Sequence, residues 1–361
     1  MSPAFSLYLD LVRFVAACLV YVYHSNQRWL ISEVLPASDY GHSSVVVFFV
    51  LSGYVIAFIT GTKERDWPSY AASRLARIYS VALPAVVLTV ALDAAGRALA
   101  PGNYDYPWDQ FPTRVVASLA MLNEVWFVSI TSFSNVPYWS ICYESWYYVL
   151  FGVICFAPRR WAWPLAAALL LMLGPKIALL APIWFMGVAL YRWQALERLP
   201  LAAAWVLALG SVVAIVVFHR FGVGVALSNG LETLIGKAWH RELTFSKFFV
   251  GDQVLGLLVF CNFAGMRRVS SAFWPVLAPL ARPIRWLAGF TLTLYLLHQP
   301  LFLFWGSVIR GDPSGPVFWW VTTLATALSV VAIGTVTESR RGDLRRALLQ
   351  RLASKGRPAN A

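Results

Sequence analysis

LYLDLVRFVAACLVYVYHSN, residues Leu7–Asn26, is an apolar stretch that carries Arg13 near one end and His24 near the other. It is long enough to form a membrane-spanning helix, which needs about 20 predominantly apolar residues. Ionisable side chains inside a bilayer are costly and are usually tied to function. The stretch therefore predicts an integral membrane fold and marks two positions as candidate functional residues.

The composition of the whole chain extends this prediction to a polytopic membrane protein. Of the 361 residues, 59% are hydrophobic and 13% are charged, which lies outside the range of ordinary soluble domains. We expect an all-α fold with about ten transmembrane helices, the first of which is retained because no cleavage site follows it. The ten apolar runs cover residues 8–23, 44–59, 78–95, 139–156, 162–174, 177–193, 201–218, 249–264, 286–309 and 317–337.

The net charge of +12 is explained by membrane orientation, so no nucleic-acid partner is expected. Most lysines and arginines fall in alternate loops and in the C-terminal segment, as the positive-inside rule requires. This pattern places both termini in the cytoplasm. It also requires that the weaker apolar run 114–129 does not cross, and we expect an interfacial or re-entrant element there.

No polar stretch is long enough to bury a core of its own. We therefore predict one membrane domain, residues 1–338, and a basic cytoplasmic tail, residues 339–361, with a short amphipathic helix and a disordered end. The segments 96–113 and 219–247 are expected to be the longest outer loops. The four cysteines lie in apolar runs at unrelated spacings, which predicts neither a disulfide framework nor a metal site.

Arg13 and His24 are eleven residues apart, which returns a helix nearly to the same face and separates the two residues by about 16 Å along its axis. We expect them to line one wall at two depths. Alternatively, Arg13 reaches the inner headgroups and His24 is an interfacial polar residue. Asp10, three residues before Arg13, is placed to pair with the guanidinium.

Two later stretches add candidate catalytic side chains. In PYWSICYESWYY (137–148), Glu144 lies near the outer start of a helix at a depth close to that of His24, where a carboxylate would orient the imidazole and raise its basicity. In FTLTLYLLHQPLF (290–302), His298 precedes Pro300, which should kink the helix. Alternatively, Glu144 is an interfacial glutamate among the aromatic residues of the membrane surface, and His298 only packs beside the kink.

Two further stretches suggest contacts to an anionic or thin ligand. SRLARIYS (73–80) places Arg74 and Arg77 one turn apart, which suits a di- or triphosphate-like anion but also fits positive-inside flanking. VVVFFVLSGYVIAF (45–58) places Ser52 and Gly53 in mid-membrane. Small residues there allow close helix packing or close approach by a ligand.

Taken together, these stretches resemble the membrane-bound acyltransferase family 3, integral-membrane O-acyltransferases that modify bacterial surface glycans. The resemblance spans nearly the whole chain. It rests on Arg13 with His24, on FFVLSGY at Phe48–Tyr54, on Arg74–Arg77, on Trp139–Glu144 and, in part, on Phe290, Tyr295 and His298. It implies a bacterial inner-membrane enzyme with acetyl-coenzyme A or another acyl-coenzyme A as cytoplasmic donor, no permanently bound cofactor, and a glycan or lipid-linked oligosaccharide as acceptor.

The resemblance also implies roles for these residues. The donor would be bound by Arg13, Arg74, Arg77, Ser52 and Gly53. His24, oriented by Glu144, would act as general base or as acyl-carrying nucleophile, and His298 would assist. The outer-loop aromatic residues Tyr104, Tyr106, Trp108 and Trp239 could stack on sugar rings, although anchoring at the membrane interface explains them equally well. A transporter or flippase without catalysis is the alternative, although the chain lacks the internal repeat of many carriers.

Overall fold

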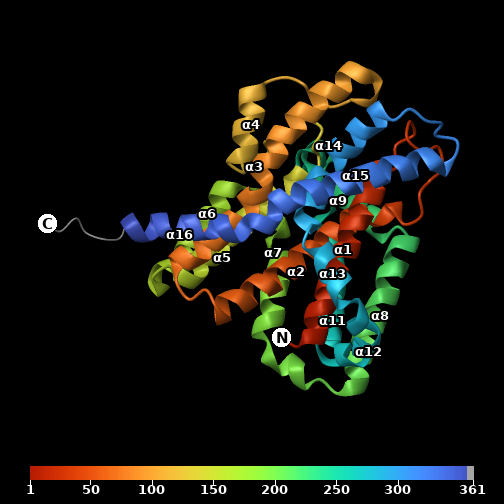
Figure 1. Ribbon diagram of the computed structural model, residues 1–361. Coiled ribbons are helices and arrows are strands. Elements are labelled where there is room, and N and C mark those ends of the chain that lie inside the picture. Colours follow the sequence, from red (N-terminus) through yellow and green to blue (C-terminus); the bar gives the residue numbers. More distant parts are fainter. Residues whose placement is uncertain (356–361) are drawn as a thin grey trace.

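The computed structural model describes residues 1–355, and all regular secondary structure in this range is helical (Figure 1). The first half contains α1 (Pro3–Ser25), α2 (Gly41–Thr62), α3 (Trp67–Leu99), α4 (Phe111–Leu119), α5 (Tyr138–Phe156), α6 (Arg159–Leu173) and α7 (Pro175–Arg192). The second half contains α8 (Leu201–Arg220), α9 (Val223–Ile235), α10 (Lys237–Glu242), α11 (Phe249–Val269), α12 (Trp274–Leu277), α13 (Ala281–Ala288), α14 (Thr291–Val308), α15 (Pro316–Val336) and α16 (Arg341–Lys355). The predicted all-α, polytopic fold is confirmed.

Six helical stretches within residues 1–355 are long and apolar enough to cross a membrane: Pro3–Ser25, Ser38–Thr62, Trp67–Leu99, Leu201–Arg220, Thr244–Ala288 and Pro316–Arg351. The count of ten crossings and the cytoplasmic position of the termini stay predictions. In the run 114–129, the nine-residue α4 measures about 14 Å. That is less than half of a hydrocarbon core about 30 Å thick, so α4 is too short to cross.

Local sequence explains where α1 begins. Ser2 Oγ accepts a hydrogen bond from Phe5 N at 3.2 Å, and Pro3 occupies the first turn. A serine cap and a proline in the first turn both favour a helix start. Because no proline or glycine interrupts residues 4–25, the helix continues unbroken past His24.

The chain departs from the predicted helix over residues 286–309. It is broken at Gly289 and Phe290, so that α13 and α14 are separate helices and Arg285 does not share a helix with His298. Glu338, just after α15, accepts hydrogen bonds from Thr293 N and Thr293 Oγ1, both at 2.9 Å. A carboxylate at a helix N-terminus offsets the unpaired N–H groups and the helix dipole.

A second departure concerns the outer loop expected over residues 219–247. This segment forms α9 and α10. The run Val223–Ile235 is apolar and helical but shorter than a spanning helix. The apolar middle of the segment packs as α9 against α8 and α11.

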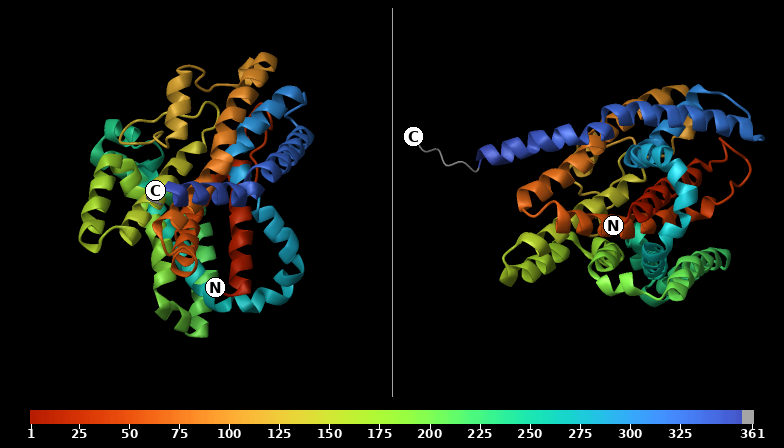
Figure 2. Two further views of the ribbon diagram at one scale, coloured as in Figure 1. Left: turned by 60° about the vertical axis from the view of Figure 1, so that its left-hand side comes forward. Right: turned by 60° about the horizontal axis from the view of Figure 1, so that its bottom comes forward.

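α1 contacts α2, α13 and α14. α2 packs against α7, and α3 packs against α14 and α16. Figures 1 and 2 show α16 continuing beyond α15 away from the bundle, and Arg345 Nε donates to Ser73 Oγ of α3 at 2.7 Å. The predicted tail therefore contains a helix, α16, although its apolar and polar residues are not separated onto two faces as expected. Residues 356–361, where a disordered end was expected, lie outside the described residues.

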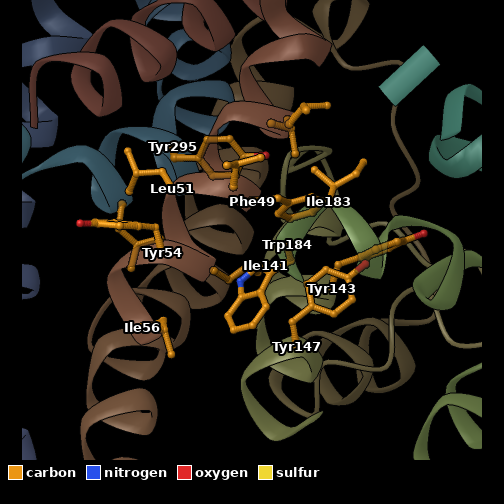
Figure 3. Close-up of a cluster of buried hydrophobic side chains, with 14 of the residues drawn as sticks. Phe49, Leu51, Tyr54, Ile56, Ile141, Tyr143, Tyr147, Ile183, Trp184 and Tyr295 are labelled. Atoms are coloured by element: carbon orange, nitrogen blue, oxygen red, sulfur yellow. The ribbon is translucent and has the colours of Figure 1, made fainter. Parts of the chain in front are cut away.

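Figure 3 shows part of the buried core, where aromatic and aliphatic side chains of α2, α5 and α7 pack together with Tyr295 of α14. Trp184 is fully buried, and its ring centroid lies 5.6 Å from that of Phe151. Gly53 is where α2 meets α7, because a Cβ atom there would lie 2.0 Å from the carbonyl oxygen of Trp184. Gly53 therefore serves close helix packing, and its contact with a donor stays a prediction.

Candidate active site

α1 presents Arg13 and His24 to two different cavities. His24 lines a cavity of about 430 Å³ near the C-terminal end of α1, which we call the His24 cavity. Arg13 lines a narrower cavity of about 40 Å³ nearer the N-terminal end, which we call the Arg13 cavity. The helical spacing of the two residues thus places them at two depths along one helix, as expected.

His298 of α14 lies directly against His24. Its Nε2 is 3.1 Å from His24 Nδ1, and the two ring centroids are 5.0 Å apart. Each Nδ1 also faces a backbone carbonyl of its own helix: His24 Nδ1 lies 3.0 Å from Val20 O, and His298 Nδ1 lies 3.0 Å from Leu294 O. The structure therefore brings together two of the three predicted catalytic side chains.

These contacts determine where the ring protons sit. A carbonyl oxygen only accepts, so each neutral ring carries its proton on Nδ1. His298 Nε2 is then an acceptor, and the N–H of His24 Nδ1 is shared between Val20 O and His298 Nε2. The remaining nitrogen of the half-buried His24, Nε2, keeps its lone pair, which is the state that a general base or a nucleophile requires.

The predicted pairing of Glu144 with His24 is not found. Glu144 Oε1 accepts from Ser52 Oγ and from Tyr148 OH, both at 2.5 Å, and its carboxylate lines the Arg13 cavity. The prediction compared depths along two helices, and depth does not fix the direction in which a helix face points. His298 occupies the place beside the imidazole that was expected for Glu144.

The Arg13 cavity gathers charges from separate parts of the chain. Arg13 and Arg77 line it together with Glu338. Arg13 Nη1 also lies 3.8 Å from Asp10 Oδ1, as the spacing of three residues predicted. Arg341, the first residue of α16, interacts electrostatically with Arg77 and Glu338. Guanidinium groups from three helices therefore converge at this end, which suits a multiply charged anion.

Arg74 does not share this site with Arg77. Its Nη2 donates to both carboxylate oxygens of Glu64, at 2.9 and 2.7 Å, and the residue is only 7% exposed. A buried arginine with a buried carboxylate partner is committed to that pair. The predicted pair Arg74–Arg77 is therefore replaced by Arg13 and Arg77, and the signal for this was the acidic residue in the preceding segment KER (63–65).

Tyr295 and Val45 line both cavities and so form the partition between them. The hydroxyl of Tyr295 lies 2.5 Å from Ser140 Oγ, and its ring packs edge-on against Phe48 with the centroids 5.4 Å apart. The ring centroid is also 6.2 Å from that of His298. The sequence identified Tyr295 only as part of a motif; its place three residues before His298, on the same helix face, could have indicated this position.

The wall of the His24 cavity is rich in polar side chains, among them Asn26, Gln27, Tyr106 and Gln299. Burial raises the pKa of the Tyr106 phenol, which therefore stays protonated and available as a hydrogen-bond donor at neutral pH. Gln299 was missed at the sequence level, although it directly follows His298. A cavity that joins an unprotonated imidazole nitrogen with amide and phenol groups can bind and deprotonate a hydroxylated ligand.

Comparisons with known proteins bear on the family of the chain. No curated protein and no solved structure matches it. The profile of acyltransferase family 3, described as an acyltransferase domain, matches residues 6–337. This range contains Arg13 and His24 on α1, Glu144 on α5 and His298 on α14. The chain therefore belongs to acyltransferase family 3, and it is a multi-pass membrane acyltransferase.

Proposed function

We propose that this protein transfers an acyl group, most simply acetyl, from cytoplasmic acyl-coenzyme A to a hydroxyl group of a glycan on the outer face of a bacterial inner membrane. The observation that carries the proposal is the His24–His298 pair, which leaves a nitrogen lone pair in a polar cavity. With a cytoplasmic N-terminus, the Arg13 cavity lies toward the donor and the His24 cavity toward the acceptor.

Positive charge at the Arg13 cavity favours binding of the acyl-coenzyme A donor at this end of α1. The phosphates of coenzyme A need cations, and Arg13 and Arg77 line the cavity at this end while Arg341 lies nearby. The rise of α1 places His24 about 16 Å further along the helix. A pantetheine arm is a thin chain of comparable reach, and the narrow space beside Ser52 suits it better than the nucleotide.

The chemistry at His24 follows from its proton pattern. As the acceptor oxygen attacks the thioester carbonyl, His24 Nε2 takes the hydroxyl proton; an ester C–O bond forms and the C–S bond breaks. The proton then passes to the departing thiolate of coenzyme A. His298 Nε2 accepts from His24 Nδ1–H throughout and stabilises the imidazolium. Attack by Nε2 itself, through an acyl-imidazole, is the two-step variant.

The partition formed by Tyr295 and Val45 bears on the size of the acyl group. The thioester must pass this partition to reach His24, and the Arg13 cavity beneath it holds only about 40 Å³. Passage therefore requires a movement of the Tyr295 side chain, which is held by Ser140 through a single side-chain hydrogen bond. A two-carbon acyl group passes with the smallest displacement, which supports acetyl transfer.

The test is thiol release from acetyl-coenzyme A by purified protein in nanodiscs, with polysaccharide extracted from the source organism as acceptor. The expected result is equimolar release of free thiol and ester-linked acetyl on the polysaccharide. A carrier would leave the thioester intact, so saturable binding without thiol release would overturn the proposal in favour of transport.

A further inference from the structure

The His24 cavity does not end at His24. Tyr23, Asp39, His42 and Phe245 line both it and a neighbouring cavity of about 860 Å³, which we call the distal cavity. Its other polar lining residues include Ser43, His219, Lys247 and Asp252. The two cavities are therefore adjacent, and His42 lies at the junction between them.

The junction carries a hydrogen-bonded His–Asp pair that the transfer chemistry does not use. His42 Nε2 lies 3.0 Å from Asp252 Oδ1 and 3.1 Å from Oδ2. The side chain of Asp252 is 3% exposed, whereas that of His42 is 28% exposed. A carboxylate this deeply buried is costly unless it is paired, so the pair fixes the ring of His42 at the cavity surface. Trp139 lies parallel to that ring on one side, with the centroids 6.3 Å apart.

The lining of the distal cavity indicates the chemistry of its ligand. Imidazoles, carboxylates, a lysine and hydroxyl groups are interspersed, and Ser43 Oγ lies 2.9 Å from His219 Nε2. Donors and acceptors of both charge signs suit a neutral ligand with many hydroxyl groups, whereas a polyphosphate would face Asp39 and Asp252. The rest of the lining is apolar and includes Phe218, Phe245, Phe248 and Leu255. Ligand pockets commonly combine such apolar walls with a few polar groups that fix the orientation of the ligand.

We infer that the distal cavity is an acceptor subsite, which holds the sugar units next to the one whose hydroxyl reacts at His24, with the His42–Asp252 pair binding the chain at the junction. This inference rests on the proposed function and deepens it. Small-molecule pockets occupy about 300–1,000 Å³, and the two cavities together, at about 430 and 860 Å³, exceed that range. The acceptor is therefore a glycan of several units and not a single sugar.

The test compares Asp252→Asn and His42→Gln with wild type in nanodiscs. Glu232→Gln is the matched control, because Glu232 forms a similar pair with His240, at 3.3 Å, outside both cavities. Acetyl-coenzyme A is the donor. The acceptors are the extracted surface polysaccharide and the same polysaccharide hydrolysed to its monosaccharides. Binding of acetyl-coenzyme A is recorded for every variant, because it reports the donor site alone.

We expect both junction variants to raise the KM for the polysaccharide by about 10- to 100-fold, the effect of losing a hydrogen bond to a charged group. Binding of acetyl-coenzyme A should not change in either junction variant, the KM for monosaccharides should rise less than that for the polysaccharide, and Glu232→Gln should resemble wild type. An unchanged KM for the polysaccharide in both junction variants would overturn the subsite. A wild type that reacts with monosaccharides as well as with the polymer would also overturn it, while the acyltransfer proposal would stand. Absence of any thiol release by wild type would overturn both.

Discussion

His298 offers a sharp test of the proton pattern at the site. In the proposed transition state His24 becomes an imidazolium, and His298 Nε2, at 3.1 Å, accepts its Nδ1–H. His298→Asn should keep a donor near Leu294 O but leave no acceptor within reach of His24. Losing a hydrogen bond to a charged group costs about 1.5–3 kcal/mol. We therefore expect the rate constant for transfer to fall roughly 10- to 150-fold.

The matched variant is His298→Gln, whose longer side chain can place a carbonyl oxygen close to the position of Nε2. It should recover most of the rate that His298→Asn loses, while the KM for acetyl-coenzyme A stays at the wild-type value in both. The assay is thiol release at saturating donor and acceptor, with thermal unfolding recorded to confirm folding. Equal rates for the Asn and Gln variants, or a folded His298→Asn protein with wild-type activity, would refute the acceptor role of His298.

Three further predictions concern the donor side and the packing. Arg77→Ala should weaken binding of acetyl-coenzyme A by about tenfold or more in a binding titration. Arg74→Ala should instead lower the free energy of unfolding by about 3–5 kcal/mol, because it leaves the buried Glu64 unpaired. The reversed pattern would contradict the assignment of Arg77 to donor binding and of Arg74 to the pair with Glu64. Tyr295→Ala should raise the rate with butyryl-coenzyme A relative to acetyl-coenzyme A by about tenfold or more. Tyr295→Phe, which keeps the ring but loses the hydrogen bond to Ser140, should raise it less; an unchanged ratio in the Ala variant would argue against the partition. Gly53→Ala should destabilise the protein by about 1–3 kcal/mol in the same unfolding assay, because its Cβ would meet a backbone oxygen at 2.0 Å, and a neutral effect would mean that α2 and α7 can separate freely.

Much of the fold could be predicted because the length of an apolar run in the sequence indicates a membrane-spanning helix. The run that contains Arg13 and His24 became α1, and the short α4 matches the weak run at residues 114–129. The break at Gly289 could not be predicted from hydropathy, since both sides of it are apolar. The start of α14 after this break is capped by a tertiary contact with Glu338, which lies far along the chain.

The relative positions of candidate site residues could be predicted only where both residues lie on the same helix. Arg13 and His24 share α1, so the helical rise alone fixed their separation. The predicted partner of His24 depended on how α5 and α14 face α1, which no single-helix pattern contains, and His298 proved to be the neighbour where Glu144 was expected. The pair His42–Asp252 joins residues more than two hundred positions apart, so only the fold reveals it.

The most direct test of the central claim is thiol release from acetyl-coenzyme A by His24→Ala in nanodiscs, measured beside acetyl-coenzyme A binding by the same protein. If His24 Nε2 is the base or nucleophile, transfer should fall by at least about 100-fold, while binding at the Arg13 cavity stays within a few-fold of wild type. Near-normal thiol release by the folded variant would contradict the account.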